Sequence, residues 1–145
     1  MLDLLPAMFK GVVVPWQVVV ELDMGRFFRP DTLDPRKLDW LSLTEVSRYE
    51  MENLPPNRLG IGERAVIAYA LSLDSGFVCL DDLLARRLAS SLGLKVIGIA
   101  GLLVAAKKQG KLDAIGPVLN RLKGEGFRLG DDVVNEAMRL AGEKP

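Results

Sequence analysis

The carboxylate side chains of this sequence are its main candidates for catalysis or metal binding. The chain contains no histidine, which excludes His-based triads, histidine general bases and the commonest zinc sites. Its single cysteine, Cys79, has no second cysteine for a disulfide or a Cys-x-x-Cys metal site, and no histidine to activate it as a nucleophile. Carboxylates, amines and hydroxyls remain, and the acidic residues of interest are Glu21, Glu63, Asp81 and Asp82.

Three of these acidic residues also have a structural explanation when each is taken alone. Glu63 stands at the start of a predicted helix, where the helix dipole favours a carboxylate by about 0.3–1 kcal/mol. Asp82 directly precedes another predicted helix, where an N-cap contributes about 0.5–2 kcal/mol relative to Ala. Glu21 could lie on the solvated side of its helix. Only their arrangement together can distinguish a site from three ordinary surface residues.

A Gly-x-Gly-x-x-Ala pattern at Gly60–Ala65 opens a predicted helix, and Asp81 and Asp82 follow a strand about twenty residues later. A dinucleotide fingerprint needs a strand directly before its glycines, but the preceding residues 53–58 contain two prolines. Glu63 would also direct a negative charge into the helix end that should bind pyrophosphate. We therefore reject dinucleotide binding.

Short apolar runs alternate with helical segments along the chain. The predicted strands are Gly11–Val14, Trp40–Leu43, Gly76–Leu80 and Lys95–Ile97. The predicted helices are Pro15–Leu22, Thr44–Asn53, Glu63–Leu73, Leu83–Leu92, Leu102–Gln109, Asp113–Leu122 and Asp131–Ala141. This alternation predicts an α/β fold with a short parallel sheet flanked by helices. Functional groups gather at the carboxyl ends of such strands, and Asp81 and Asp82 stand at one of them.

The length of 145 residues and the 49% hydrophobic content predict a single domain over residues 1–145. Glu21–Asp39 and Asn53–Gly62 are interpreted as connections inside that domain. Nineteen Lys and Arg balance nineteen Asp and Glu, which argues against nucleic-acid binding through bulk positive charge. No membrane span and no export signal is evident, and with one free cysteine a cytoplasmic location is expected.

The order of these segments resembles the PIN-domain proteins, in the branch close to VapC-type toxins. The likeness covers nearly the whole chain, and it depends on the order and spacing of its pieces. The matching segments are Val14–Leu22 (VPWQVVVEL), Leu59–Ala65 (LGIGERA), Leu80–Ala89 (LDDLLARRLA), Gly93–Gly98 (GLKVIG), Ala105–Gly110 (AAKKQG) and Gly126–Gly130 (GFRLG).

The resemblance implies a three-layer PIN-like fold and a ribonuclease that depends on Mg²⁺ or Mn²⁺. Glu21, Glu63 and Asp82 match three acidic positions of the family, and Asp81 could assist Asp82 as a ligand. Several carboxylates at one edge repel one another, and a hard divalent ion with oxygen ligands relieves that repulsion. Arg86 and Arg87 could contact RNA phosphates. The resemblance further implies RNA as substrate, an antitoxin protein as partner, a homodimer, and no membrane.

The chain departs from the family at its first strand. In the family that strand runs through the middle of the sheet and ends in an Asp that is normally a central metal ligand. No segment of this sequence matches it. We do not assign the role of that Asp to Asp3. Its absence would leave two neighbouring strands with unpaired backbone groups, each costing about 1–3 kcal/mol. Three explanations are open: a start that lies upstream, strands that close up or accept a partner's strand, or a remodelled inactive descendant.

Two other functions stay open beside the ribonuclease. The first is a non-catalytic PIN-like module that binds RNA or a protein partner, and the missing first-strand Asp motivates it. The second is a doubly wound small-ligand enzyme that uses Asp81 and Asp82 as phosphoacceptor domains do.

Overall fold

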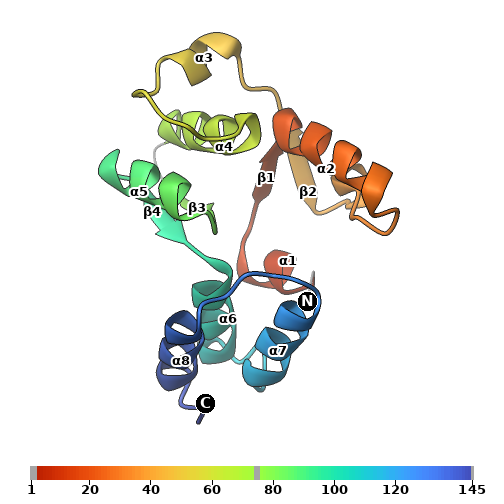
Figure 1. Ribbon diagram of the computed structural model, residues 1–145, viewed down its shortest axis with the longest axis vertical. Helices are drawn as coiled ribbons and strands as arrows, with labels where there is room; N and C mark the ends of the chain where they lie inside the picture. The colour runs from red at the N-terminus through yellow and green to blue at the C-terminus, as the bar shows by residue number, and fades with distance from the viewer. Residues whose placement is uncertain (1–2, 74–75, 145) are drawn as a thin grey trace. The chain divides into compact units, whose positions relative to one another are not determined.

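The computed structural model describes residues 3–73 and 76–144 (Figure 1). Contacts divide the chain into two compact units, one formed by residues 9–96 and the other by residues up to 8 together with residues from 97 onward. Each unit is described by itself, and the single domain over residues 1–145 stays a prediction. The mixture of helices and short strands confirms the α/β class.

The unit of residues 9–96 begins with a parallel β–α–β arrangement. Strand β1 (Val12–Pro15) leads into helix α2 (Trp16–Phe28), and strand β2 (Leu41–Thr44) pairs parallel to β1 with Val12 opposite Leu41. The β-branched run of β1 favours an extended backbone, and Pro15 caps α2 because its fixed φ of −65° suits a helix start. The amide of Gln17 donates to the carbonyl of Val46, 2.8 Å away, and so ties α2 to the chain after β2.

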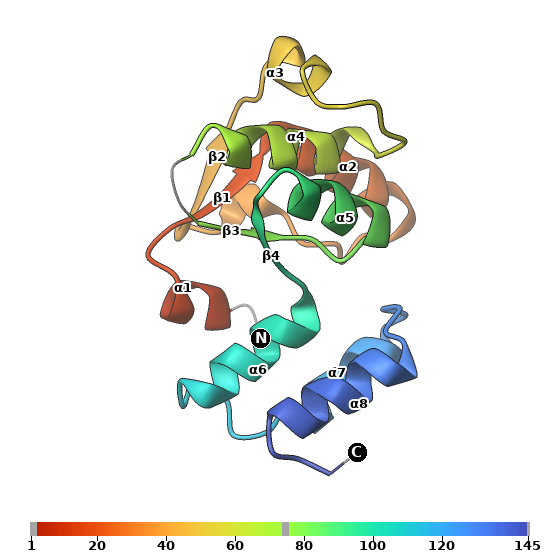
Figure 2. The same cartoon turned by 90° about the vertical axis from the view of Figure 1, so that its left-hand side faces the viewer.

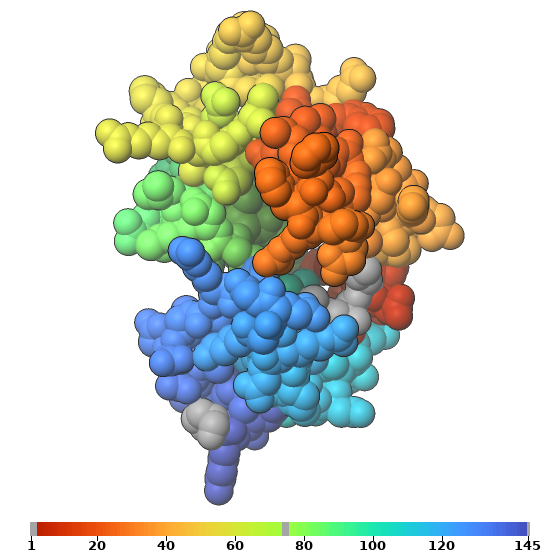
Figure 3. Space-filling model, turned by 45° about the vertical axis from the view of Figure 1, so that its right-hand side comes forward, coloured from red at the N-terminus to blue at the C-terminus, as the bar shows by residue number. Residues whose placement is uncertain are grey.

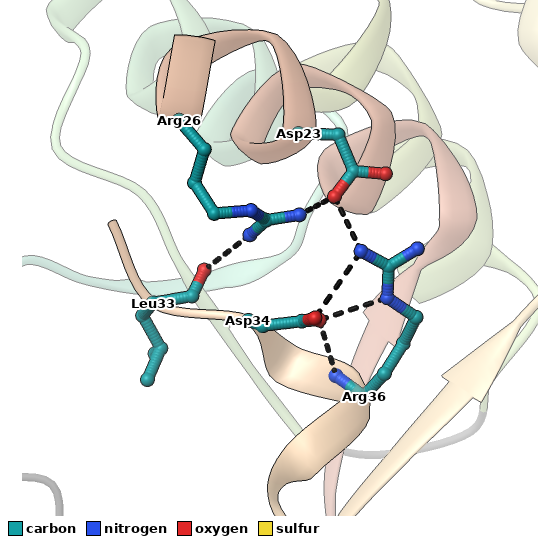
Figure 4. Close-up of polar contacts among 5 residues, drawn as sticks. All are labelled: Asp23, Arg26, Leu33, Asp34 and Arg36. Atoms are coloured by element: carbon teal, nitrogen blue, oxygen red, sulfur yellow. Dashed lines mark hydrogen bonds and ion pairs between the residues drawn. The ribbon is translucent and has the colours of Figure 1, made fainter. Parts of the chain in front are cut away.

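Helix α2 is longer than the sequence predicted. It continues to Phe28, so the interpretation of residues 21–39 as a connection is wrong for the first eight of them. The helix ends just before Pro30, because a proline disfavours helical backbone in the residue before it. Figure 4 shows the contacts that fix this end: Asp23 is paired with Arg26 and with Arg36, and Arg26 donates to the carbonyl of Leu33, 3.0 Å away.

A short turn of helix holds the chain between α2 and β2. This 3-10 turn, η1 (Pro35–Lys37), is capped by Asp34, whose carboxylate accepts from the backbone N–H of Arg36. The Arg36 guanidinium also binds that carboxylate at 2.8 Å and lowers the pKa of Asp34. Local polar contacts and the buried ring of Pro35 therefore order this segment.

Helix α4 (Ile61–Leu71) is the central helix of the unit. It packs against β1, α2, α3 (Arg48–Glu52), β3 (Phe77–Cys79) and α5 (Leu83–Ser91), and Figure 2 shows α4 and α5 over the strands. Alanines in α4 and α5 are fully buried, which allows the two helices to approach closely. The core of the unit consists of Val46, Met51, Leu54, Ala65, Ile67, Ala68, Val78, Leu80, Ala85 and Ala89.

The strands of the described residues form two separate pairs rather than one sheet. β1 pairs with β2, and β3 pairs with β4 (Lys95–Ile97), with no hydrogen-bonded strand between the pairs. Helix α4 nevertheless packs against strands of both pairs. One of the three explanations, in which the remaining strands close up into one sheet, is therefore wrong for the described chain. The separation into two pairs agrees with the expectation from the sequence that two neighbouring strands have unpaired backbone groups.

The second unit is helical. It contains α1 (Leu4–Met8), α6 (Ile99–Lys108), α7 (Gly116–Gly124) and α8 (Asp131–Leu140). Its core consists of Ala100, Leu103, Val104, Ile115, Leu119, Leu122, Ala137 and Met138. Among the described residues no helix is long and apolar enough to cross a membrane.

Helix α8 begins at Asp131 as the sequence predicted, but two other helix starts in this unit need correction. Helix α6 begins three residues earlier than expected, directly after Gly98, which supplies its extended N-cap. Helix α7 begins three residues later, because Pro117 is favoured in the first turn and the carboxylate of Glu143 binds the helix start.

Candidate functional site

The predicted site residues all lie in the unit of residues 9–96. Glu21 is in the middle of α2, Glu63 is in the first turn of α4, and Asp82 is the N-cap of α5. Asp81 directly precedes that cap, after β3, and Arg86 and Arg87 follow in α5. The acidic residues are therefore carried by α4 and by the two helices that pack against it, α2 and α5.

Glu21 contacts the start of α4 directly. Its Oε1 accepts a hydrogen bond from the backbone N–H of Gly62, 2.9 Å away and 41 positions further along the chain. The first backbone N–H groups of a helix have no partner within the helix, so a carboxylate from another element can satisfy one of them. Glu21 is thus attached to α4 and is not simply a solvated helix residue, although its side chain remains largely exposed.

Asp82 has the capping role that the sequence predicted. Its Oδ2 accepts a hydrogen bond from the backbone N–H of Ala85, 2.9 Å away, and Gly93 ends the helix region with a positive φ of 84°. One oxygen of Asp82 is therefore committed to the fold, while its residue as a whole is exposed.

The pKa of Glu63 shows the influence of the neighbouring carboxylates. Partial burial raises its pKa, and the negative charges of Asp82 and Glu21 raise it further, while a backbone hydrogen bond from Gly60 acts in the opposite direction. Glu63 therefore lies close enough to both other carboxylates to experience their repulsion. The structure thus brings the three predicted residues into one electrostatic neighbourhood.

Asp81 and Arg86 lie on the other side of the cap, next to Cys79. Partial burial raises the pKa of the Cys79 thiol; Asp81 raises it further and Arg86 lowers it. Arg86 is half-buried and Arg87 is exposed. One of the two arginines thus lies close to Cys79, and the other is at the surface of α5.

The donor set suits a hard divalent ion by its chemistry, because every candidate ligand is a carboxylate oxygen. The mutual repulsion felt at Glu63 is also the condition that such an ion relieves. Within the described part of the chain, however, no three acidic or other ligand side chains converge closely enough to enclose a metal ion. The carboxylates are neighbours, and they do not form a closed ligand cage.

Two features of this site could not be assigned from the sequence pattern. The Gly60–Gly62 segment, rejected as a dinucleotide fingerprint, instead receives the Glu21 carboxylate. Arg64, next to Glu63, has a buried Nε without a hydrogen-bond partner, and no sequence signal distinguished it from other arginines.

The described chain thus combines an α/β fold with carboxylates beside the starts of α4 and α5. A family model described as a PIN domain matches residues 1–143, and the chain belongs to the PIN-domain family. No curated protein and no solved structure matches the chain.

Proposed function

We propose that this protein is a metal-dependent ribonuclease of the PIN type, in the branch of VapC-like toxins. Glu21, Glu63 and Asp82 would hold Mg²⁺ or Mn²⁺, and Asp81 would assist Asp82. The observation that carries the proposal is the contact of the Glu21 carboxylate with the start of α4, where Glu63 stands. The raised pKa of Glu63, to which Asp82 and Glu21 both contribute, supports it. A bound divalent ion would offset the repulsion between these carboxylates.

Each of the three carboxylates would have its own role in holding the ion. Glu21 and Asp82 each have one oxygen bonded to a backbone N–H, which fixes their orientation and leaves the second oxygen for a ligand role. Glu63 lies between them on α4 and would carry its charge fully once a cation is bound. A bound divalent ion supplies an activated water and stabilises charge on a phosphodiester, so no histidine is needed.

The arginines of α5 would orient the RNA. Arg86 is half-buried close to Cys79, and Arg87 is exposed one position further along the same helix. Guanidinium groups bind phosphate oxygens through two parallel hydrogen bonds, which fixes a backbone without reading its sequence. An overall formal charge of zero is compatible with this function, because the ion and two arginines supply positive charge locally.

The test is Mn²⁺ binding and cleavage of RNA by the wild-type chain and by Glu63→Gln. We expect binding and cleavage that Glu63→Gln abolishes. Glu50→Gln, on the exposed surface of α3, serves as the matched control and should behave as the wild type. Absence of Mn²⁺ binding together with absence of cleavage sensitive to Glu63→Gln would disprove the proposal. The family's first-strand Asp has no counterpart, so affinity should be weaker than that of a site with all its ligands.

An antitoxin partner forms part of the toxin hypothesis. Its test is co-purification with the product of a neighbouring gene, followed by loss of RNA cleavage in the complex. A neighbouring product that binds but leaves cleavage unchanged would contradict the toxin assignment and leave the nuclease assignment standing.

The second candidate is a non-catalytic interaction module, and one observation favours it. Trp16, Val20, Met24 and Phe27 recur every three or four residues, which places them on one face of α2, and all four are exposed. Phe27 and Phe28 pack edge to face and are 88% and 85% exposed. Val19, about 100° around the helix from Val20, is buried, so the apolar surface of α2 extends from the core of its unit to the exposed face, as is typical of a helix that is covered in its assembly. Figure 3 shows α2, in orange, at the surface of its unit.

We infer that a second copy of the chain covers this apolar face. The carboxylate of Asp23, which lies beside it, is already paired with Arg26 and Arg36, so the face offers little unpaired charge to a strongly charged partner. The formal net charge of zero also means that two copies do not repel one another.

Light scattering after gel filtration decides this assignment. The wild type should be a dimer whose unfolding temperature rises with protein concentration, and the variant Phe27→Ser/Phe28→Ser a folded monomer whose unfolding temperature does not, because association stabilises only the folded dimer. A monomeric wild type would exclude the second copy and leave a different protein, or RNA, as the occupant.

A further inference from the structure

Phe28, the last residue of α2, exposes an aromatic ring on the same helix as Glu21. The residue is 85% exposed, and its ring packs edge to face with that of Phe27. Phe28 and Glu21 are seven positions apart, which places them about 20° apart around α2 and about 10 Å apart along it. Phe28 therefore shares a face of α2 with Glu21, whereas Phe27 lies about 100° further round, on the apolar face.

The strip of α2 from Glu21 to Phe28 has no side chain at its centre. Gly25 lies between the two residues, about 40° from Glu21 around the helix, and a Cβ added there would meet no atom within 4 Å. Glycine inside a helix costs about 1 kcal/mol relative to alanine, and no neighbouring atom requires it at this position. The strip is therefore open to a ligand that lies along the helix backbone.

The last turns of α2 are held by contacts that leave the ring of Phe28 exposed. Asp23 pairs with Arg26 and with Arg36, which comes from beyond the helix (Figure 4). The ring is thus carried on a helix end that is ordered before any ligand binds. A platform of this kind lowers the entropy that binding has to overcome.

Two arginines near this strip carry positive charge that the fold does not use. Arg29 directly follows Phe28, and Arg58 stands two residues before Gly60, where a Cβ would come within 3.5 Å of Oε1 of Glu21. Both are exposed, and within residues 3–73 and 76–144 neither guanidinium pairs with a carboxylate. Exposed aromatic rings together with unpaired cations are the groups that bind single-stranded nucleic acid, because the rings stack on bases and the cations contact phosphates.

We propose that Phe28 binds single-stranded RNA by stacking on a base, and that Arg29 and Arg58 contact its phosphates. The choice of RNA rests on the proposed function, but the binding itself requires no metal ion. The separation of Glu21 and Phe28 along the helix corresponds to about three stacked nucleotides. Phe28 is therefore a positioning residue that determines which part of the strand lies beside the carboxylates. Since every base has a face for stacking, the contact favours single strands over duplexes without reading a sequence.

A second copy of the chain is the alternative occupant of this ring, because Phe28 borders the apolar face of α2. The surroundings of the ring favour RNA. On its other side lie Glu21 and the open Gly25, and Arg29 follows it in the chain, whereas the centre of a protein interface is depleted of charged residues.

The experiment measures binding of a short fluorescent oligouridine by anisotropy in EDTA, which removes divalent ions and so prevents metal-dependent cleavage. We expect the wild type to bind and Phe28→Ser to bind about tenfold more weakly. Phe28→Tyr should keep the wild-type affinity because its ring also stacks. Phe28→Leu, which is apolar but has no aromatic face, should be as weak as Phe28→Ser. Tyr49→Ser is the matched control, since Tyr49 is an exposed aromatic residue on α3, and it should bind like the wild type.

Substitutions at the arginines and at Gly25 test the rest of the surface. Arg29→Gln and Arg58→Gln should each weaken binding and lower the slope of log Kd against log salt concentration by about 0.7, as loss of one phosphate contact does. Arg48→Gln is their control, because Arg48 is 90% exposed and paired with Glu52, and it should keep the wild-type slope. Gly25→Gln fills the open strip with a side chain and should also weaken binding.

The outcomes separate this inference from the proposed function. Absence of RNA binding by the wild type in EDTA, or equal affinity in Phe28→Ser, would overturn the role of Phe28, while Mn²⁺-dependent cleavage sensitive to Glu63→Gln would still support the nuclease. RNA binding that depends on Phe28, without any cleavage, would disprove the nuclease and leave Phe28 in an RNA-binding module. Loss of the dimer in Phe28→Ser with unchanged RNA affinity would assign the ring to the second copy and overturn the inference.

Discussion

Asp82 and Ala85 are joined by a hydrogen bond in which the backbone N–H of Ala85 donates to Oδ2 of Asp82 over 2.9 Å. This bond makes Asp82 the N-cap of α5, and it occupies one of the two carboxylate oxygens. The residue that the resemblance assigns to metal binding is therefore also part of the fold. A loss of activity on substitution would not by itself distinguish the two roles, but a choice of substitutions can.

Replacing Asp82 by Ala and by Ser separates capping from charge. Asp82→Ala should lower the free energy of unfolding by about 1 kcal/mol, which corresponds to a fall of about 2–4 °C in unfolding temperature, because the Ala85 N–H loses its acceptor. Asp82→Ser keeps an oxygen in the capping position and should retain most of that stability. Both variants should lose Mn²⁺ affinity equally. Calorimetry and thermal unfolding of the two proteins check this, and normal Mn²⁺ affinity in Asp82→Ser would restrict Asp82 to its capping role.

Glu63 should destabilise the protein when no metal is bound. Its pKa in the folded state is raised by burial and by Asp82 and Glu21, so the unfolded chain loses this proton at a lower pH than the folded one. The folded state is therefore favoured below the ordinary glutamate pKa, and this advantage is lost as the pH rises through the higher folded pKa. Glu63→Gln should then raise the unfolding temperature at pH 7 by about 1–4 °C and flatten its pH dependence above the ordinary glutamate pKa.

Differential scanning calorimetry without metal measures this effect. Glu50→Gln on the exposed surface of α3 is the control and should keep the wild-type pH profile. A lower unfolding temperature for Glu63→Gln at pH 7 would show that the Glu63 charge is compensated in the fold, which contradicts the repulsion on which the proposed site depends.

The parts of this site that depend on local signals could be predicted from the sequence. Asp before an apolar helix and Gly after it predicted the start of α5 and, to within one residue, its end. The strand Lys95–Ile97 was predicted at its observed bounds. Capping and strand formation are decided within a few neighbouring residues, and for that reason they are visible in the order of residue types.

The contact between Glu21 and Gly62 could not be predicted in the same way. The two residues are 41 positions apart, and their meeting depends on how α2 packs against α4. The Gly-x-Gly pattern indicated only that a close approach to the helix start was possible, and the identity of the approaching group came from tertiary structure. The extension of α2 to Phe28 was missed for a related reason, since its last turns depend on Arg36 from beyond the helix.

The reactivity of Cys79 should report on the neighbourhood of Asp81. Partial burial and Asp81 raise the pKa of the thiol, while Arg86 lowers it, and only the thiolate is alkylated. We expect Asp81→Asn to accelerate alkylation by iodoacetamide at pH 8 by roughly two- to threefold, and Arg86→Gln to slow it by a similar factor. Mn²⁺ bound near Asp81 should also accelerate the reaction. Rates in Asp81→Asn that equal those of the wild type would place Asp81 too far from the thiol to act on it.

Glu143 should give the helical unit a sharp sensitivity to acid. Its carboxylate accepts hydrogen bonds from Nζ of Lys107 at 2.8 Å and from the backbone N–H groups of Ile115 and Gly116 at 2.7 and 3.0 Å. These contacts, with the Lys107 bond the largest cause, lower its pKa from 4.5 to about 2. A lowered pKa means that the stabilisation is complete above the unfolded value and is lost as the pH falls from about 4.5 to about 2.

Glu143→Gln tests this by removing the charge while keeping the shape of the side chain. The variant should unfold several degrees below the wild type at pH 6, and the difference should shrink toward pH 2, where the wild-type carboxylate becomes protonated. Circular dichroism of the helices against temperature, at a series of pH values, measures both curves. Glu125→Gln, whose side chain lies at the exposed end of α7 and pairs with Arg121, should follow the wild type. Because α7 begins at the two N–H groups that Glu143 binds, parallel curves for Glu143→Gln and the wild type over the whole pH range would mean that this helix start is stabilised without the Glu143 charge.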